Sequence, residues 1–445
     1  MPDAGAIAGQ KIEVTRAAME EARAIEGALI RLGASISIVS APTGQADACI
    51  LTEALADGAI SDRHFQVLDL CRAHAATPMI VLDRADASGV RALGGCGGLV
   101  RTLRLERPDA QIRTLSLGRY ANAAEAAKRM AAGLGVDAAD VMLEPDGIYV
   151  QTLGGPLNPP DTVNHTGADG VWLVTGGARG VTSDCAVEVA RRTQGHFILM
   201  GRSAQTAWPA WLEPVPDLKS LRATLARNSG RDDVPKRPAD IDRLARQLLA
   251  SREIDETLAR IRDTGTTAAY VPVDLSDSAR IKSALEPALG GQTVSGLIHG
   301  AGVLADAHVD KQTEESFGTV FGPKVDGLVA LLDCLDMSAL RHVALFSSAS
   351  AVFGNPGQAN YAAANAWLNH AAGVIRKASE TIKVRSFCWG PWEGGMVDEG
   401  LAKMFAARGI PLIARAEGAR ILADQILDAE HDHLLLTVGE EWGAE

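Results

Sequence analysis

Hydrophobic residues recur in short runs along the chain, and stretches with helical periodicity separate these runs. In the first third of the chain, four runs have the length and composition of strands, at residues 35–39, 48–52, 79–82 and 112–117. Helices are predicted around them at residues 14–33, 61–75, 98–106 and 121–134. Residues 141–150 predict a hairpin with Pro-Asp-Gly as its turn. This alternation indicates a small layered βα structure.

A second and longer series of strands follows a linker at residues 154–170, which is rich in glycine, proline and small polar residues. Its predicted strands lie at residues 171–175, 197–200, 268–273, 294–299, 342–346 and 384–388. The unusually long crossover at residues 204–265 includes a helix from about residue 240 to 262, which a right-handed connection requires. The rest of the crossover is either a surface elaboration or a docking site for a partner. The predicted fold class is α/β, with a Rossmann-like doubly wound parallel sheet in residues 166–445, preceded by a truncated Rossmann-like structural subdomain in residues 1–165.

The glycine-rich turn after the strand at residues 171–175 predicts a nucleotide site. Backbone N–H groups in such a turn approach a pyrophosphate, and the dipole of the following helix adds to the attraction. Sites that prefer NAD carry an acidic residue at the end of the next strand, whereas this chain has Arg202 there. Together with Arg179 in the turn, Arg202 favours a 2′-phosphate and therefore NADPH; the alternative is that Arg202 is a solvated surface residue. The residues assigned to the cofactor in this part of the chain are Thr175, Gly176, Arg179, Gly180, Val181, Arg202 and Ser203.

Two later strand ends are expected to complete the cofactor site. Asp274 and Leu275 follow the third strand and are placed to contact adenine, while Gly300, Ala301 and Gly302 follow the fourth and let a ribose lie against the chain. The first third of the chain has one glycine cluster, at residues 94–98, and no clean strand precedes it. This cluster is interpreted as a flexible entry to a helix, with phosphate binding as the alternative, so the structural subdomain is expected to have no cofactor site.

A hydroxyl and a phenol are predicted to converge in the second series. Ser348 follows the apolar run at residues 342–346, and the carboxyl ends of strands are where open α/β sheets place their chemistry. Tyr361 and Asn365 are four residues apart in an alanine-rich stretch, so they share one face of a helix. Ser348 and Tyr361 can therefore meet at one carbonyl oxygen, unless they are ordinary loop and helix residues.

The motif Phe346-Ser347-Ser348 … Gly354-x-Pro356-Gly357-Gln358-x-x-Tyr361-x-x-x-Asn365 resembles that of ketoreductase domains of polyketide and polyunsaturated-fatty-acid synthases, in the short-chain dehydrogenase/reductase superfamily. The resemblance covers nearly the whole chain and implies that Ser348, Tyr361 and Asn365 are active residues. It also implies a catalytic lysine at Lys324, within Pro-Lys-Val-Asp-Gly. Lys324 is expected to lower the pKa of Tyr361, and Asn365 to position Lys324 or a water molecule. The sequence departs from many relatives at Thr182, where they have a third glycine.

The resemblance also implies how substrate is oriented. Pro391 is expected near the nicotinamide, and a helix around residues 399–408, which follows Met396, is a candidate substrate lid. In the family, an aspartate loop and the loop before the tyrosine distinguish the two product configurations. The residues that match or replace this fingerprint are Asp306, Phe353, Pro356 and Asn360, and they favour the (3R)-hydroxyacyl product.

Composition narrows the classes of function. A formal charge of −12 argues against nucleic acid as a partner, and no apolar run is long enough to span a membrane. No secretory signal is recognised at the start, six scattered cysteines indicate free thiols, and no metal motif is present, so a cytoplasmic location is expected. The predicted function is NADPH-dependent reduction of a 3-ketoacyl thioester, with acyl carrier protein and other synthase domains as partners. The alternatives are a free-standing reductase of small ketones or acyl-CoA esters, and a catalytically silent scaffold domain.

Overall fold

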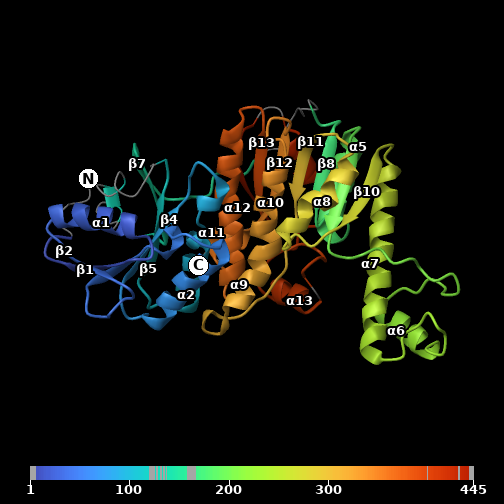
Figure 1. Ribbon diagram of the computed structural model, residues 1–445, viewed down its shortest axis with the longest axis horizontal. Helices are drawn as coiled ribbons and strands as arrows, with labels where there is room; N and C mark the ends of the chain where they lie inside the picture. The colour runs from blue at the N-terminus through green and yellow to red at the C-terminus, as the bar shows by residue number, and fades with distance from the viewer. Residues whose placement is uncertain are drawn as a thin grey trace.

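The first half of the chain forms a seven-stranded sheet in the order β2-β1-β3-β4-β5-β6-β7 (Figure 1). The computed structural model describes residues 7–119, 126, 129–130, 133, 136, 138–157, 167–397, 399–428 and 431–439. All neighbouring strands are parallel except β6 and β7, which form the predicted hairpin. The strands are β1 (Lys11–Thr15), β2 (Ser35–Val39), β3 (Ala48–Leu51), β4 (Met79–Arg84), β5 (Ile112–Leu117), β6 (Asp140–Glu144) and β7 (Gly147–Tyr149). The helices that pack on this sheet include α1 (Met19–Arg31), α2 (Ile60–Ala73) and α3 (Cys96–Glu106).

One predicted helix in this half begins too early. The prediction for residues 14–33 merges the end of β1 with α1, which starts only at Met19. Strand β1 pairs with β2 on one side and β3 on the other, so its four residues from Ile12 to Thr15 are buried. The run Lys-Ile-Glu-Val-Thr contains too few apolar residues to predict a buried strand. The helix predicted at residues 121–134 falls mostly outside the described residues.

The second half forms a fully parallel seven-stranded sheet in the doubly wound order β10-β9-β8-β11-β12-β13-β14. Its strands are β8 (Val171–Thr175), β9 (His196–Gly201), β10 (Thr267–Pro272), β11 (Val294–His299), β12 (His342–Ser348), β13 (Lys383–Trp389) and β14 (Leu435–Val438). Its helices are α5 (Gly180–Arg192), α6 (Leu218–Arg227), α7 (Pro238–Arg262), α8 (Ser278–Leu289), α9 (Glu314–Phe321), α10 (Gly327–Cys334), α11 (Ala349–Phe353), α12 (Ala359–Ala378), α13 (Glu399–Ala407) and α14 (Arg415–Ile426). Strand β14 and helix α14 were not predicted; β14 is a short edge strand of four residues, Leu-Leu-Thr-Val, of which only Leu436 is buried.

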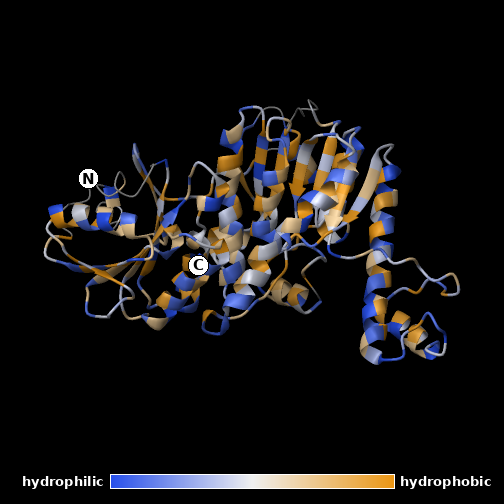
Figure 2. Ribbon diagram, in the orientation of Figure 1, coloured by the Kyte–Doolittle hydropathy of each residue, from blue (hydrophilic) through white to orange (hydrophobic). Residues whose placement is uncertain are grey.

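The two halves share one apolar core. The largest cluster of buried hydrophobic side chains includes residues of α2 and α3 as well as residues of α9 and α12. Helix α12 lies between the two sheets in Figure 1, and Figure 2 shows hydrophobic residues along the strands of the second sheet. The halves are therefore packed together as a single body around the helix that carries Tyr361.

The long crossover between β9 and β10 forms a projecting lobe. Helix α6 and the first half of α7 extend away from the second sheet (Figure 1) and enclose a small core of their own. The buried members of that core are Leu212, Leu221, Leu225, Val234, Ile241, Ala245 and Leu248. None of the helices in the described ranges is long and apolar enough to cross a membrane. The six cysteines are free, as predicted.

Candidate active site

A cavity of about 730 Å³ opens along the carboxyl ends of strands β8, β9, β11, β12 and β13. It is lined by eleven of the residues assigned to the cofactor: Gly176, Arg179, Gly180, Val181, Arg202, Ser203, Leu275, Gly300, Ala301, Gly302 and Pro391. Thr175 and Asp274 do not line it. The Thr175 hydroxyl lies 2.9 Å from His299 Nδ1 in the core, and Asp274 accepts a hydrogen bond from the Ser276 N–H in the turn before α8.

The turn before α5 has the geometry that a dinucleotide requires. Gly176 has a φ of +67°, and a Cβ there would lie 2.9 Å from the Ala301 backbone nitrogen. Gly180 has a φ of +65°, opens α5 and faces open space. No side chain caps α5, so its first N–H groups remain available for an anion. These residues fit a nicotinamide dinucleotide, and Gly180 leaves room for its pyrophosphate.

Thr182 stands where many relatives have a third glycine, and Gly300 leaves the space for its side chain. The Thr182 side chain is buried, and a Cβ added at Gly300 would lie 2.5 Å from its hydroxyl oxygen. Gly300 thus provides the close approach between α5 and the end of β11 that a glycine in the helix would otherwise give.

The glycine cluster at residues 94–98 of the first half does not leave a free helix N-terminus, as the turn before α5 does. Asp83, at the end of β4, is buried, and its Oδ2 accepts hydrogen bonds from the N–H groups of Gly95 (3.1 Å) and Cys96 (2.8 Å), at the start of α3. Any side chain at Gly94 would overlap the Asp83 carboxylate. An acceptor for the free N–H groups at this helix N-terminus is therefore supplied from within the fold. The cluster is the entry to a helix, as predicted, and the Asp83 side chain occupies the helix N-terminus.

The same cluster brings α3 against the helix that carries Tyr361. A Cβ at Gly95 would lie 2.7 Å from the Ala363 carbonyl oxygen, and one at Gly98 would lie 2.3 Å from the Ala362 carbonyl oxygen. Both contacts are to the backbone of α12, which cannot move aside as a side chain can. Glycine is therefore needed at these positions for the two helices to touch.

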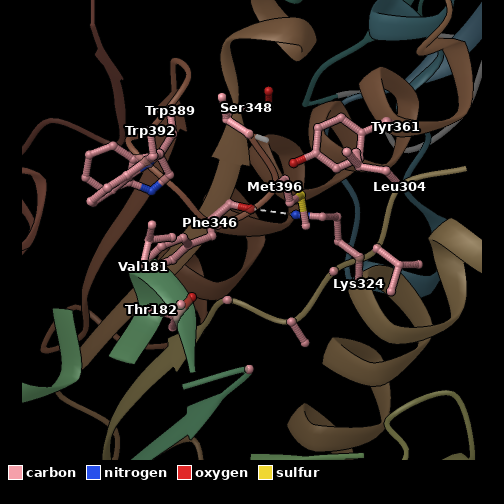
Figure 3. Close-up of a pocket in the computed structure, with 18 of the residues that line it drawn as sticks. Val181, Thr182, Leu304, Lys324, Phe346, Ser348, Tyr361, Trp389, Trp392 and Met396 are labelled. Atoms are coloured by element: carbon pink, nitrogen blue, oxygen red, sulfur yellow. Dashed lines mark hydrogen bonds between the residues drawn. The ribbon is translucent and has the colours of Figure 1, made fainter. Parts of the chain in front are cut away.

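Ser348, Tyr361 and Lys324 line one side of the cavity (Figure 3). Ser348 ends β12 and caps α11, Tyr361 lies in the first turn of α12, and Lys324 lies in a π-helical turn at Gly322–Asp326. The Lys324 ammonium donates a hydrogen bond to the Phe346 carbonyl oxygen (2.7 Å) and lies 5.4 Å from the centre of the Tyr361 ring. Asn365 does not line the cavity; its Nδ2 donates to the Tyr361 carbonyl oxygen one turn earlier (2.8 Å).

Burial dominates the protonation of this cluster. It lowers the pKa of Lys324 from 10.5 to about 7 and raises the pKa of Tyr361 from 10.0 to about 12, while the side chains of Asn365 and Ser348 oppose the shift of the tyrosine. The expected lowering of the pKa of Tyr361 is not found: desolvation of the phenol raises this pKa, and the groups that oppose the rise are Asn365 and Ser348. Near neutral pH Tyr361 therefore holds its proton, and Lys324 titrates.

The residues expected to orient substrate divide into two groups. Asp306, Pro356 and Met396 line the cavity, whereas Phe353 and Asn360 do not. Asn360 is buried behind the wall, where its Nδ2 donates to the Ala305 carbonyl oxygen (3.0 Å) and its Oδ1 accepts from the Tyr361 N–H (2.7 Å). It supports the cavity wall from behind.

Several residues of the cavity were not predicted. Tyr270 reaches across from β10, and its hydroxyl donates to the Ser203 carbonyl oxygen (2.8 Å). Gln358 donates through Nε2 to Asp306 Oδ2 (2.8 Å) and so connects the loop before α12 to the loop after β11. Gln358 stands in the motif around Tyr361 and could have been found there, whereas Tyr270 carries no motif. Helix α13, the predicted lid, adds Leu401, Met404 and Phe405 to the lining.

Comparison with known proteins identifies the family. The model of the KR domain matches residues 170–394, half of the chain, and includes the glycine turn, Lys324, Ser348 and Tyr361. The chain belongs to the KR domain family. It is thereby a ketoreductase domain, an oxidoreductase of the short-chain dehydrogenase/reductase superfamily that uses a nicotinamide cofactor.

The relatives include large synthases. The chain is 33% identical over 371 residues to a polyunsaturated fatty acid synthase protein of Thraustochytrium sp., a match that covers 80% of this chain and 13% of that protein. It is 31% identical over 312 residues to erythronolide synthase EryA3 of Saccharopolyspora erythraea, covering 68% of this chain and 8% of that protein. A solved A1-type ketoreductase has the same fold, with a TM-score of 0.71, 19% identity and coverage of 98% of this chain and 90% of that one. The predicted pair of Rossmann-like subdomains is confirmed.

Proposed function

We propose that this ketoreductase domain uses NADPH to reduce a 3-ketoacyl thioester, carried by acyl carrier protein, to the (3R)-hydroxyacyl thioester. The observation that carries the proposal is that Tyr361, Ser348 and Lys324 share one cavity with the uncapped N-terminus of α5 and the glycines that follow β8 and β11. Residues 166–445 are proposed as the catalytic subdomain. Residues 1–165 are proposed as a structural subdomain without a cofactor site, which the internal capping of α3 by Asp83 supports.

The nicotinamide, when bound, supplies the hydride that reaches the ketone carbon. The protein orients the ketone and stabilises the negative charge that develops on its oxygen. The hydroxyl groups of Ser348 and Tyr361 donate hydrogen bonds to that oxygen, and Tyr361, which is protonated near neutral pH, transfers its proton to it. Lys324 is close enough to stabilise the phenolate that remains and, with a pKa of about 7, to take part in returning the proton. Asn365, bonded to the Tyr361 carbonyl oxygen, fixes the turn of α12 that holds the phenol.

The substrate carrier is tested by measuring NADPH consumption with one 3-ketoacyl group on acyl carrier protein and on a small thiol. A higher kcat/KM on the carrier protein is expected, since the relatives are multidomain synthases. Equal values on both thioesters would favour a free-standing reductase. Binding of NADPH without turnover of either thioester would favour a silent scaffold.

Replacing Arg202 by alanine is expected to weaken NADPH binding about 10- to 150-fold and to leave NADH binding nearly unchanged. Only NADPH carries the 2′-phosphate, and one charge-assisted hydrogen bond contributes roughly 1.5–3 kcal/mol. Arg202 is exposed at the cavity edge, whereas Arg179 already faces Glu253 at 3.6 Å. Fluorescence titration of both cofactors measures the effect, with Arg179→Ala as the matched variant. Equal losses of affinity for NADPH and NADH would show that Arg202 does not bind the 2′-phosphate, and Arg179 would become the candidate for this role.

The reduction product is expected to be predominantly the 3R alcohol for an unbranched substrate. Asp306 and Pro356 both line the cavity, and the hydrogen bond from Gln358 to Asp306 ties the two loops that carry them together. The wall along which the thioester enters determines which face of the ketone meets the hydride. Chiral chromatography of the product checks this, and a predominant 3S alcohol would overturn the assignment.

A further inference from the structure

Helix α3 of the first half forms hydrogen bonds from three of its residues to the segment between Ser348 and Tyr361. Arg101 Nη1 donates to the Ala351 carbonyl oxygen at 2.8 Å. One residue later, the Thr102 hydroxyl accepts a hydrogen bond from the Asn355 N–H at 3.2 Å. One turn further on, Glu106 Oε1 accepts from the Gly357 N–H at 2.7 Å. The helix therefore follows this segment along its length.

Gly354 shows how closely the two elements fit. It has a φ of +76°, and a Cβ there would lie 2.9 Å from backbone atoms of Arg101 and Thr102. We name residues 354–358 the tyrosine loop, since they lead into α12. The backbone of this loop lies against the backbone of α3, so its path depends on a helix some 250 residues earlier in the chain.

Glu106 also contacts the segment that follows β11 and includes Asp306. Its second oxygen, Oε2, accepts from the Val309 N–H at 2.8 Å and lies 3.0 Å from His308 Nδ1. We name residues 303–309 the aspartate loop, because they include Asp306. The Glu106 side chain is only 4% exposed, so its carboxylate lies buried between the two loops. The loops are bonded to each other beside it, through the Ala307 N–H and the Gly357 carbonyl oxygen at 2.9 Å.

We propose that Glu106 is a positioning residue of the ketoreductase site. By accepting one backbone hydrogen bond from each loop, its carboxylate fixes the separation of Pro356 and Asp306, which both line the cavity. The structural subdomain thereby controls how the thioester is aligned, and with it the configuration of the product. The catalytic part of this inference rests on the proposed function, whereas the ordering of the two loops does not.

Removing the Glu106 carboxylate is expected to separate the two loops, because their backbone N–H groups lose a buried acceptor. Glu106→Ala leaves the N–H groups of Val309 and Gly357 without their acceptor in a poorly solvated place, and hydrogen bonds to a charged group are among the stronger ones. Glu106→Gln retains the size and one acceptor oxygen but places an amide N–H against one of two backbone N–H groups. The loops are expected to separate in both variants, and more in the alanine variant.

Hydrogen–deuterium exchange of the full chain tests the ordering directly. Peptides that cover residues 303–309 and 354–358 are expected to exchange at least tenfold faster in Glu106→Ala, and to a smaller degree in Glu106→Gln. The control is Arg91→Ala. This substitution removes an ion pair between Arg91 and Asp333, which also joins the two halves. Both side chains of this pair are exposed, and neither belongs to the two loops. Unchanged exchange in both Glu106 variants, or the same increase in Arg91→Ala, would overturn the proposal.

Steady-state assays then test the catalytic part. Glu106→Gln is expected to raise KM for the thioester several-fold and to increase the minor product alcohol several-fold, with the Kd of NADPH unchanged, because α5 and its glycine turn do not touch Glu106. Arg91→Ala is expected to leave the KM and the product ratio at wild-type values. A loss of kcat alone, with wild-type KM and product ratio, would contradict a positioning role. A wild-type chain that reduces no thioester would refute the proposed function, and the exchange experiment would still decide the ordering of the loops.

Discussion

Tyr361→Phe is expected to lower kcat by about 10²- to 10⁴-fold while the Kd of NADPH stays within a few-fold of the wild-type value. A positioned general acid contributes an effect of this size, and the phenylalanine ring retains the packing of the tyrosine without its proton. Burial raises the pKa of Tyr361 to about 12, so at neutral pH the wild-type residue is fully protonated and can donate. Stopped-flow or steady-state measurement of NADPH oxidation gives kcat, and a fluorescence titration gives Kd.

Tyr149→Phe is the matched control for this substitution. Tyr149 lies on β7, is about half exposed and does not line the cavity, so the same chemical change is expected to leave kcat unaltered. Comparable turnover in Tyr361→Phe and wild type would remove the proposed role of the phenol. A large loss of NADPH binding in Tyr361→Phe would indicate instead that the ring, and not the hydroxyl, is what the site needs.

The central strands of the second sheet could be predicted from sequence with nearly correct bounds. Strands β8 and β11 match their predicted ranges. Strand β8 is a nearly continuous apolar run, as expected of a parallel strand buried on both faces, whereas β11 is marked by Val294, Leu297 and Ile298. Strand β1 was missed although it lies inside its sheet, since only Ile12 and Val14 mark it as apolar. Its burial depends on strands from elsewhere in the chain, and this information is absent from a local pattern.

In the candidate site, too, the features marked by a local motif were predictable and those that depend on distant segments were not. A motif in one stretch predicts that Ser348 and Tyr361 lie together, and the structure places both on the cavity with Lys324. The support behind them was not predictable, because it comes from distant segments. Glu106 has no motif, and its two loops lie about 200 and 250 residues further along the chain. The pKa of Tyr361 was predicted with the wrong sign because a sequence shows neighbouring charges but not the depth of burial.

Gly98→Ala is expected to destabilise the protein by about 1–3 kcal/mol, although alanine is the better helix former. Gly98 lies inside α3, where exchange for alanine alone would favour the folded state by up to about 1 kcal/mol. The new Cβ, however, would lie 2.3 Å from the carbonyl oxygen and 2.6 Å from the carbonyl carbon of Ala362. These are backbone atoms of α12, so relief requires the two helices to separate along a buried interface.

Gly27→Ala provides a control of opposite sign. Gly27 lies inside α1, and a Cβ there would meet only the flexible end of Arg31 at 3.6 Å, so this variant is expected to gain up to about 1 kcal/mol. Urea unfolding of both variants measures the two effects, and NADPH oxidation by the folded Gly98→Ala protein is expected to fall as well, since α12 carries Tyr361. If both variants are stabilised alike, helix propensity outweighs packing, and the close contact between α3 and α12 does not hold the two halves together. If the signs differ as expected, the glycines of the first half are retained to bring α3 against the helix that holds the phenol.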